Sequence, residues 1–249
     1  MLPRLVTACA VMLACARAAA DVANLEAGLP TEIADAEPME SGEREFQMAA
    51  VWDRERSGAN RVLLEPQLQW GFAQRWQAAV NLRGVFGSAD RAGSGDVRLE
   101  VLRKLNDEGR RLPAFAALVR LDVPTGRDTR GVDTTLRLIA TKTLGEQPHT
   151  HQVHVNAGWI RNASPAAQER PDRGRLLIGY STLLAERTVL VADVIREHER
   201  ERGQKASIAE VGLRRQFGRD TLVSLGLGAG QGGASAARWR AVFGLEQMF

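Results

Sequence analysis

From residue 43 to the end of the chain, apolar and polar side chains alternate in segments of about ten residues. The last segment shows this most clearly. Its apolar face carries Trp239, Ala241, Phe243, Leu245 and Phe249. Its other face carries Arg238, Arg240, Gly244 and Glu246. A period of two is that of a β-strand, whose successive side chains point to opposite faces of a sheet. The pattern therefore predicts strands rather than helices.

Twelve such segments follow one another, separated by short stretches rich in Gly, Pro, Asp and Asn. They lie at about 43–52, 61–72, 76–86, 96–105, 113–123, 133–144, 150–161, 174–184, 188–198, 206–217, 221–229 and 237–249. Many strands at regular spacing are typical of an all-β barrel or sandwich. An even number of strands of this length suits a closed antiparallel transmembrane β-barrel.

Alternation alone does not separate a membrane barrel from a soluble β-sandwich, because both bury one face of every strand. The connections differ, however. The longer set lies near 53–60, 87–95, 124–132, 162–173, 199–205 and 230–236. The mostly shorter set lies near 73–75, 106–112, 145–149, 185–187 and 218–220. Long loops on one rim and short turns on the other are typical of outer-membrane barrels.

Aromatic residues favour the same interpretation, because they lie near strand ends on the apolar face. Trp and Tyr concentrate at membrane–water interfaces, whereas a sandwich core would hold its aromatics in the middle of strands. The predicted membrane-interface aromatics are Trp52, Trp70, Trp76, Trp159, Trp239 and Phe249.

The polar face of the strands is strongly charged. A charge that faces lipid costs about 2–4 kcal/mol at the bilayer midplane, so a membrane barrel must turn these side chains inward. The predicted lumen-lining residues are Arg83, Arg98, Glu100, Arg120, Asp122, Arg137, Asp193, Glu210, Arg214 and Arg240. The near balance of signs leaves two interpretations open: the residues line a narrow selective pore, or they pair and lock a closed barrel.

Two segments precede the barrel. Residues 1–20 combine Arg4, an apolar stretch and Ala18-Ala19-Ala20, which predicts a cleaved secretory signal peptide. Residues 21–42 are acidic and aperiodic, which predicts a flexible N-terminal arm before a barrel of residues 43–249. After the signal there is no long uninterrupted apolar run, so the sequence predicts no transmembrane helix.

Composition narrows the chemistry further. The only cysteines, Cys9 and Cys15, fall within the predicted signal peptide, which excludes disulfide and thiolate chemistry from the mature chain. Without the signal, 31 basic residues stand against 30 acidic residues, and no basic block stands out. The sequence therefore gives no support to nucleic-acid binding.

Three histidines and one His–Asn pair are candidates for a metal site or a catalytic site. His149, His151 and His154 lie close in sequence, but neighbouring strand faces do not converge three metal ligands, so no metal site is predicted. His154 and Asn156 share the polar face without an evident serine partner, and a nucleophile needs a base within hydrogen-bond reach. We therefore expect no catalytic residues and no cofactor.

Two further motifs have structural explanations. The glycines between 226 and 233 do not lie between a strand and a helix, so they do not form a phosphate cradle. They are expected to let the barrel bend or an inward loop approach closely. The charged run from 196 to 202 is expected to be a solvated loop. The alternative is that its arginines contact the phosphates of lipopolysaccharide.

Short motifs resemble those of the outer-membrane transporters grouped under the MetA pathway of phenol degradation. Gly93-Ser94-Gly95-Asp96 resembles the family's Gly-x-Gly-Asp strand opening, and Pro124-Thr125-Gly126 resembles its Pro-Thr-Gly element a strand later. The turn from Trp70 to Trp76 and the terminal strand ending in Phe249 also resemble this family. The resemblance covers most of the mature chain and implies a barrel that passes small, often hydrophobic, compounds.

The sequence thus predicts a passive channel for small solutes in a bacterial outer membrane. Its expected partners are outer-membrane lipid, lipopolysaccharide and the barrel-assembly machinery, which would read the C-terminal strand. Two other functions remain open: a closed structural or adhesive barrel acting through its long loops, and a soluble periplasmic β-sandwich that binds a ligand.

Overall fold

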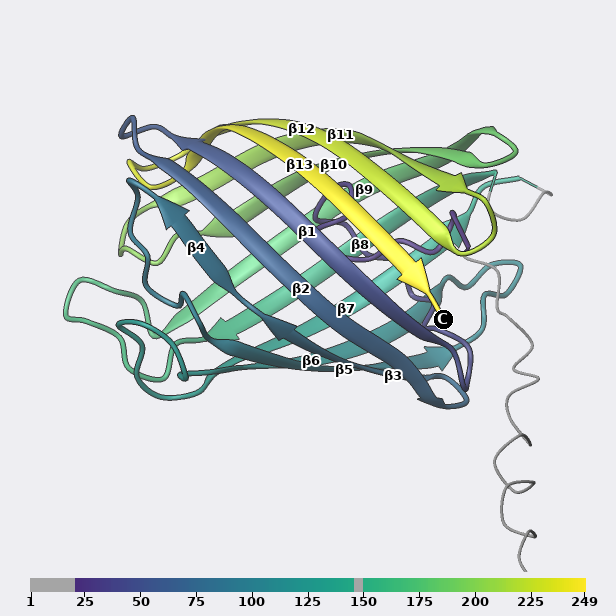
Figure 1. Ribbon diagram of the computed structural model, residues 1–249, viewed down its shortest axis with the longest axis horizontal. Helices are drawn as coiled ribbons and strands as arrows, with labels where there is room; N and C mark the ends of the chain where they lie inside the picture. Colours follow the sequence, from purple (N-terminus) through teal and green to yellow (C-terminus); the bar gives the residue numbers. More distant parts are fainter. Residues whose placement is uncertain (1–20, 146–149) are drawn as a thin grey trace, which may run out of the picture.

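The computed structural model describes residues 21–145 and 150–249. Its strands form one antiparallel sheet that curls into a closed barrel (Figure 1). The predicted signal peptide of residues 1–20 and the predicted turn histidine His149 lie outside the described residues. Within the two described ranges, no helix is both long and apolar enough to cross a bilayer.

Thirteen strand segments occupy twelve positions in the barrel wall. They are β1 (Arg44–Glu55), β2 (Asn60–Ala73), β3 (Trp76–Leu82), β4 (Gly84–Gly87), β5 (Val97–Asn106), β6 (Ala114–Val123), β7 (Asp133–Thr143), β8 (His151–Arg161), β9 (Asp172–Ala185), β10 (Thr188–His198), β11 (Lys205–Phe217), β12 (Thr221–Gln231) and β13 (Ala237–Met248). Segments β3 and β4 are two halves of one position, because both pair with β2 and only Arg83 separates them.

The barrel closes where the first strand meets the last. β1 pairs with β2 on one side and with β13 on the other, with Met48 opposite Leu245. A closed ladder leaves no unpaired strand edge, which is the condition for a sheet to lie in hydrocarbon. The predicted all-β closed antiparallel barrel is confirmed, and a two-sheet sandwich is excluded.

The predicted asymmetry of the connections holds for the tightest turns and the longest loops, but the connection 107–113 on the short-turn side is longer than 56–59, 199–204 and 232–236 on the other side. One rim carries the two-residue turns 74–75 and 186–187, whereas the other carries the loops 88–96, 124–132 and 162–171. The loop expected at 53–60 is shorter, because β1 continues to Glu55. We call the second rim the long-loop rim.

Burial in this barrel is the reverse of that in a soluble protein. On β12, Leu225 and Leu227 are exposed on the outer wall, while Ser224 of the same strand faces inward and is fully buried. Of the predicted interface aromatics, Trp52, Trp159, Trp239 and Phe249 expose 41–69% of their surface, and Trp70 and Trp76 are half-buried. The apolar face is thus the outer face, which is the arrangement that a bilayer requires.

The expectation of a flexible arm at residues 21–42 differs from the structure. These residues, here named the inner segment, lie inside the barrel, where their trace is visible between the strands in Figure 1. Leu25, Leu29 and Ile33 are at most 2% exposed. Leu25 and Ile33 join a cluster with wall residues that include Leu177 and Val191. The apolar side chains of this segment, which follow no period in the sequence, therefore pack against apolar residues of the inner wall.

Wall glycines make room for residues 29–33 of the inner segment, which we call its tip. A Cβ atom on Gly226 would lie 2.1 Å from the carbonyl oxygen of Pro30, and one on Gly244 would lie 2.2 Å from Leu29. Both distances are below any tolerable contact, so these positions need glycine for close approach. The expected close approach at Gly226 is therefore present, but it is made by the inner segment rather than by a loop.

A buried ion pair lies in the interior near the seam. Arg214 on β11 pairs with Glu246 on β13, and their side chains are 2% and 0% exposed. Ser224 on the intervening β12 also donates a hydrogen bond to Glu246. Such a pair contributes little net free energy to folding, because desolvation offsets the attraction. Removal of one partner is nevertheless costly, because it leaves an uncompensated buried charge.

We therefore expect Arg214→Met to destabilise the folded barrel by about 3–5 kcal/mol. The measurement is urea unfolding in detergent, followed by the heat-modifiable shift in gel migration. The double variant with Glu246→Gln removes both charges and should recover part of the loss. A single variant as stable as the parent would contradict the role assigned to this pair.

Candidate functional site in the barrel interior

The ten residues predicted to line the lumen all lie in the wall with side chains that are buried or half-buried. Asp193, Glu210, Arg137 and Arg214 are at most 5% exposed. The structure brings nine of the ten within ion-pair or hydrogen-bond distance of another polar group on the wall or on the inner segment. Arg137 is the exception among the contacts described here.

One group of interior charges lies on β2, β5 and β6. Arg98 Nε lies 2.8 Å from Asp122 Oδ1, and its Nη1 lies 3.3 Å from Glu65 Oε1. One residue pair further along the same two strands, Arg120 Nε lies 2.9 Å from Glu100 Oε1. Arg83 contacts Glu65 only at 4.0 Å. Opposite charges on neighbouring strands thus neutralise each other across the ladder.

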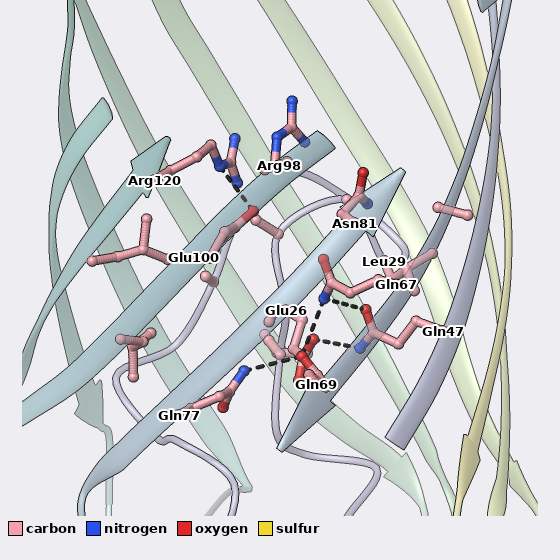
Figure 2. Close-up of a pocket in the computed structure, with 18 of the residues that line it drawn as sticks. Glu26, Leu29, Gln47, Gln67, Gln69, Gln77, Asn81, Arg98, Glu100 and Arg120 are labelled. Carbon is pink, nitrogen blue, oxygen red and sulfur yellow. Dashed lines mark hydrogen bonds and ion pairs between the residues drawn. The ribbon is translucent and has the colours of Figure 1, made fainter. Parts of the chain in front are cut away.

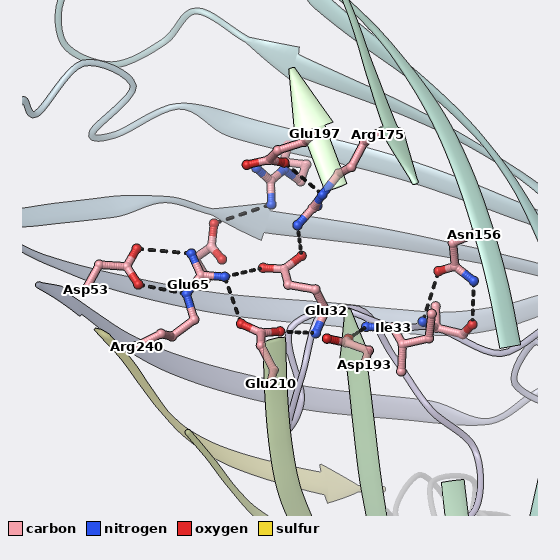
Figure 3. A network of polar contacts seen from close by, with 12 residues as sticks. Glu32, Ile33, Asp53, Glu65, Asn156, Arg175, Asp193, Glu197, Glu210 and Arg240 are labelled. Atoms are coloured by element: carbon pink, nitrogen blue, oxygen red, sulfur yellow. Dashed lines mark hydrogen bonds and ion pairs between the residues drawn. The ribbon is translucent and has the colours of Figure 1, made fainter. Parts of the chain in front are cut away.

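A second group surrounds Arg240 on β13 (Figure 3). Its guanidinium binds both oxygens of Asp53, at 2.7 and 3.1 Å, and Glu210 Oε1 at 3.1 Å. Arg61 also donates to Asp53, at 2.7 Å. Because bidentate guanidinium–carboxylate pairs fix both partners in one geometry, Arg240 is held in place by the wall itself.

The inner segment inserts a carboxylate into this second group. Glu32 Oε2 lies 3.0 Å from Arg175 Nη2 on β9, and Glu32 Oε1 lies 3.6 Å from Arg240 Nη1. The backbone N–H of Glu32 donates to Glu210 Oε2 at 3.0 Å. Burial alone would raise the pKa of the Glu32 carboxyl, but the nearby arginines outweigh it and hold this pKa well below its usual range. The tip is thus anchored by charge as well as by packing.

Wall side chains also satisfy the backbone of the inner segment. The N–H of Ile33 donates to Asp193 at 2.9 Å, and that of Ala36 to Thr141 Oγ1 at 3.0 Å. Asn156 forms two bonds with the Ala34 backbone, accepting at 3.0 Å and donating at 2.9 Å (Figure 3). An irregular chain buried in this way needs such partners, because unpaired buried backbone groups are costly.

An amide-rich cavity lies between the inner segment and the wall formed by β1, β2, β3 and β5 (Figure 2). Glu26 of the inner segment accepts hydrogen bonds from Gln47 and Gln69. Gln67 and Gln77 both donate to Gln69 Oε1, at 3.1 and 3.0 Å. The cavity is therefore lined by groups that can bind a polar solute or water.

Sequence reasoning missed several members of the interior. Glu32 lay in the presumed arm, Asp53 in a presumed loop, and Arg175 at an uncertain strand start. The glutamines of the amide cavity lie on the polar faces of their strands, but they carry no charge that would single them out in the sequence. Inward parity on β2 was the one signal that could have identified Gln67 and Gln69 together.

Arg137 on β7 differs from the other predicted lumen arginines, because each of those forms an ion pair and Arg137 forms none among the described residues. It is 3% exposed, and its Nη1 has no hydrogen-bond partner among the described residues. A buried donor without a partner costs about 1–3 kcal/mol. Arg137 therefore has an N–H donor in the interior that is free to bind a solute or water.

The structure gives His154 the serine partner that was missing in the sequence. Its Nε2 lies 2.9 Å from Ser181 Oγ, and its Nδ1 lies 3.1 Å from Thr141 Oγ1. His154 and Ser181 are at most 2% exposed. Ala36 of the inner segment donates to Thr141, so this contact is packed against the segment. In the described part of the chain, no three His, Cys, Asp or Glu residues gather as a metal site.

Comparisons with known proteins found matches only among solved structures. No family model matches the chain, and no curated protein matches it. The outer membrane channel COG4313 from Pseudomonas putida F1 matches with a TM-score of 0.67 at 14% identity, covering 86% of this chain and 98% of that one. The KdgM porin matches at 0.58 and 7% identity, covering 82% of this chain and 99% of the porin.

The NanC porin gives a similar result, with a TM-score of 0.58, 8% identity, and coverage of 82% of this chain and 97% of the porin. At these identities the likeness establishes the fold and not the solute. The chain therefore has the fold of outer-membrane barrels that include channels and porins.

Proposed function

We propose that this protein is a passive channel of a bacterial outer membrane whose lumen is closed by its own inner segment. One observation carries the proposal: a polar, charged interior is enclosed by an apolar outer wall and filled by a segment that is not part of that wall. A barrel with only a structural role has no need of a separate chain segment in its centre.

The location rests on the outer surface. Apolar side chains cover the outer wall, aromatics stand near strand ends, and the long loops share one rim. Phe249 follows β13 directly and is 69% exposed, which adds an aromatic side chain at the short-turn rim. These features support insertion with the long loops outside and the short turns in the periplasm.

Opening would consist of withdrawal of the inner segment towards the short-turn rim, where it continues into β1. The contacts that hold it are side-chain hydrogen bonds, the ion pairs of Glu32 and Glu37, apolar packing and one short backbone pairing at Ser41, all reversible. The wall pairs between Arg240 and Asp53 and between Arg98 and Asp122 do not involve the segment. They would therefore keep the interior ordered after the segment leaves.

Two features bear on the kind of solute that would pass. The resemblance to the phenol-degradation transporters implies small and often hydrophobic compounds. The charged arginine groups and the amide cavity favour solutes that also carry a polar group. Small amphipathic molecules, such as hydroxylated aromatic compounds, satisfy both conditions.

A disulfide lock tests whether the inner segment is the gate. Residues 21–249 contain no cysteine, and a Cβ on Gly179 would lie 3.1 Å from the Cβ of Ile33. This is slightly closer than the usual disulfide spacing of about 3.8 Å, so a small shift allows Ile33→Cys and Gly179→Cys to cross-link. In planar bilayers we expect no open-channel events when the pair is oxidised and their return on reduction.

Each single cysteine variant serves as the control and should conduct alike with and without reductant. Equal conductance of the oxidised and reduced double variant would show that solutes pass without movement of the segment. Absence of conductance in the parent, the reduced pair and the singles would instead favour the closed structural or adhesive barrel.

Crowding the tip should have the opposite effect. Gly226→Leu places a side chain where Pro30 packs, so we expect the segment to be displaced and the open probability to rise. Thr31→Cys, 1% exposed in the parent, should then react faster with a membrane-impermeant maleimide. Ala229→Leu on the outer face of the same strand is the matched control and should change neither property. If a Gly226→Leu barrel with normal heat-modifiable migration showed unchanged labelling, the packing of Pro30 against Gly226 would not hold the segment in place.

A further inference from the structure

A basic groove lies on the outer wall of the barrel near the long-loop rim. It is lined by residues of β8, β9, β10 and β11, among them Gly174, Leu176, Arg196, His198 and Lys205. Arg196 and Lys205 are exposed, and strand alternation places them on the same outer face as the exposed Val194. Gly174 has no side chain, which leaves space on the outer wall between its neighbours.

Of the charged residues that line this groove, Arg175 and Glu197 pair with each other, whereas the outward Arg196 and Lys205 have no acidic partner in the described chain. Arg196 Nη1 donates to Ser207 Oγ at 2.5 Å, and no carboxylate of the described chain lies within ion-pair distance of Arg196 or Lys205. His198 Nδ1 accepts from the N–H of Gly174 at 3.2 Å. The next outer-wall cation, Arg161, differs because Asp172 neutralises it at 2.9 Å. Two unpaired cations on a wall whose interior arginines are mostly paired point to an anion from outside.

The depth of the groove indicates which kind of anion. In the register of β8 and β9, Gly174 lies opposite Trp159, which is 42% exposed on the outer wall. An exposed tryptophan marks the level of the lipid headgroups. Towards the middle of the wall the surface continues through Leu176 and Val194, both exposed and apolar. The groove is thus basic at the headgroup level and apolar where acyl chains begin.

Two loops hold further arginines above the groove. The connections 162–171 and 199–204 are joined by backbone hydrogen bonds from Arg170 to Arg200 and from Arg202 to Gln168, at 2.8 and 2.9 Å. Arg200 Nε is paired with Glu169 at 2.6 Å, which orders the side chain. The charged run is therefore divided. Residues 196–198 belong to β10 and line the groove, whereas Arg200, Glu201 and Arg202 are exposed in the connection, as expected of a solvated loop.

We propose that this groove binds the phosphorylated headgroup of lipopolysaccharide in the outer leaflet, with a lipid phosphate between Arg196 and Lys205 and an acyl chain along Leu176 and Val194. Guanidinium and ammonium groups bind phosphate through charge-assisted hydrogen bonds, which gain strength at a partly desolvated interface. The inference rests on the proposed outer-membrane location with the long loops outside, but not on conduction.

The test measures binding of diphosphoryl lipid A to the intact mature barrel in detergent by native mass spectrometry. Parent protein is compared with the double variant Arg196→Gln/Lys205→Gln, and with Arg54→Gln as the matched control. Arg54 is an outward residue of β1 near the same rim, and it does not line the groove. We expect the double variant to lose at least about tenfold in affinity, equal to the loss of one charge-assisted contact, and the control to lose none.

Two lipid comparisons separate the sources of phosphate. Monophosphoryl lipid A should bind more weakly than the diphosphoryl form, and phosphatidylglycerol should bind no better to the parent than to the double variant. Equal affinity of parent and double variant for diphosphoryl lipid A would overturn the proposal, as would phosphatidylglycerol binding as tightly as lipid A. The double variant should keep the conductance of the parent, so failure of lipid binding and failure of the channel proposal are distinguishable.

Discussion

The structure depends on one constraint: a sheet whose outer face is apolar must satisfy all its backbone hydrogen bonds and all its charges within itself. The ladder does the first by pairing β1 with β13, so that no strand edge remains. The inward charges do the second by pairing between neighbouring strands, as Arg98 does with Asp122 and Arg214 with Glu246. The near balance of charge in the mature sequence follows from this requirement.

The inner segment meets the same requirement, although it pairs with a wall strand only near its end, where Ser41 lies opposite Gly71 of β2. Its backbone donors find side-chain acceptors on Asp193, Glu210 and Thr141, and its apolar side chains pack against wall residues. Because these contacts use side chains rather than a ladder, they can break without opening the barrel. The segment is thus separable from the wall in a way that no strand is, and this makes it a credible gate.

Arginine side chains are paired with acids to different extents on the inner and outer faces of the wall. Inside, most guanidiniums of the described residues are oriented by carboxylates of adjacent strands, as Arg98 is by Asp122 and Arg240 by Asp53. Outside, Arg196 and Lys205 stand at the headgroup level without an acid nearby, while Arg161 is neutralised by Asp172. The same residue type therefore organises the lumen on one face and offers a site for lipid phosphate on the other.

Local sequence determined the wall. A period of two, with turn residues between segments, fixed strand positions to within a few residues, and parity fixed which side chains of strands such as β12 and β13 face inward, because a one-residue slip would move every charge into lipid. What fills the interior was decided only by the tertiary structure. Residues 21–42 have no period, and nothing local shows that Gly226 and Gly244 leave space for Pro30 and Leu29, that Glu32 would meet Arg175, or that Ser181 would meet His154. Those contacts join residues more than twenty positions apart, and only closure of the barrel brings them together.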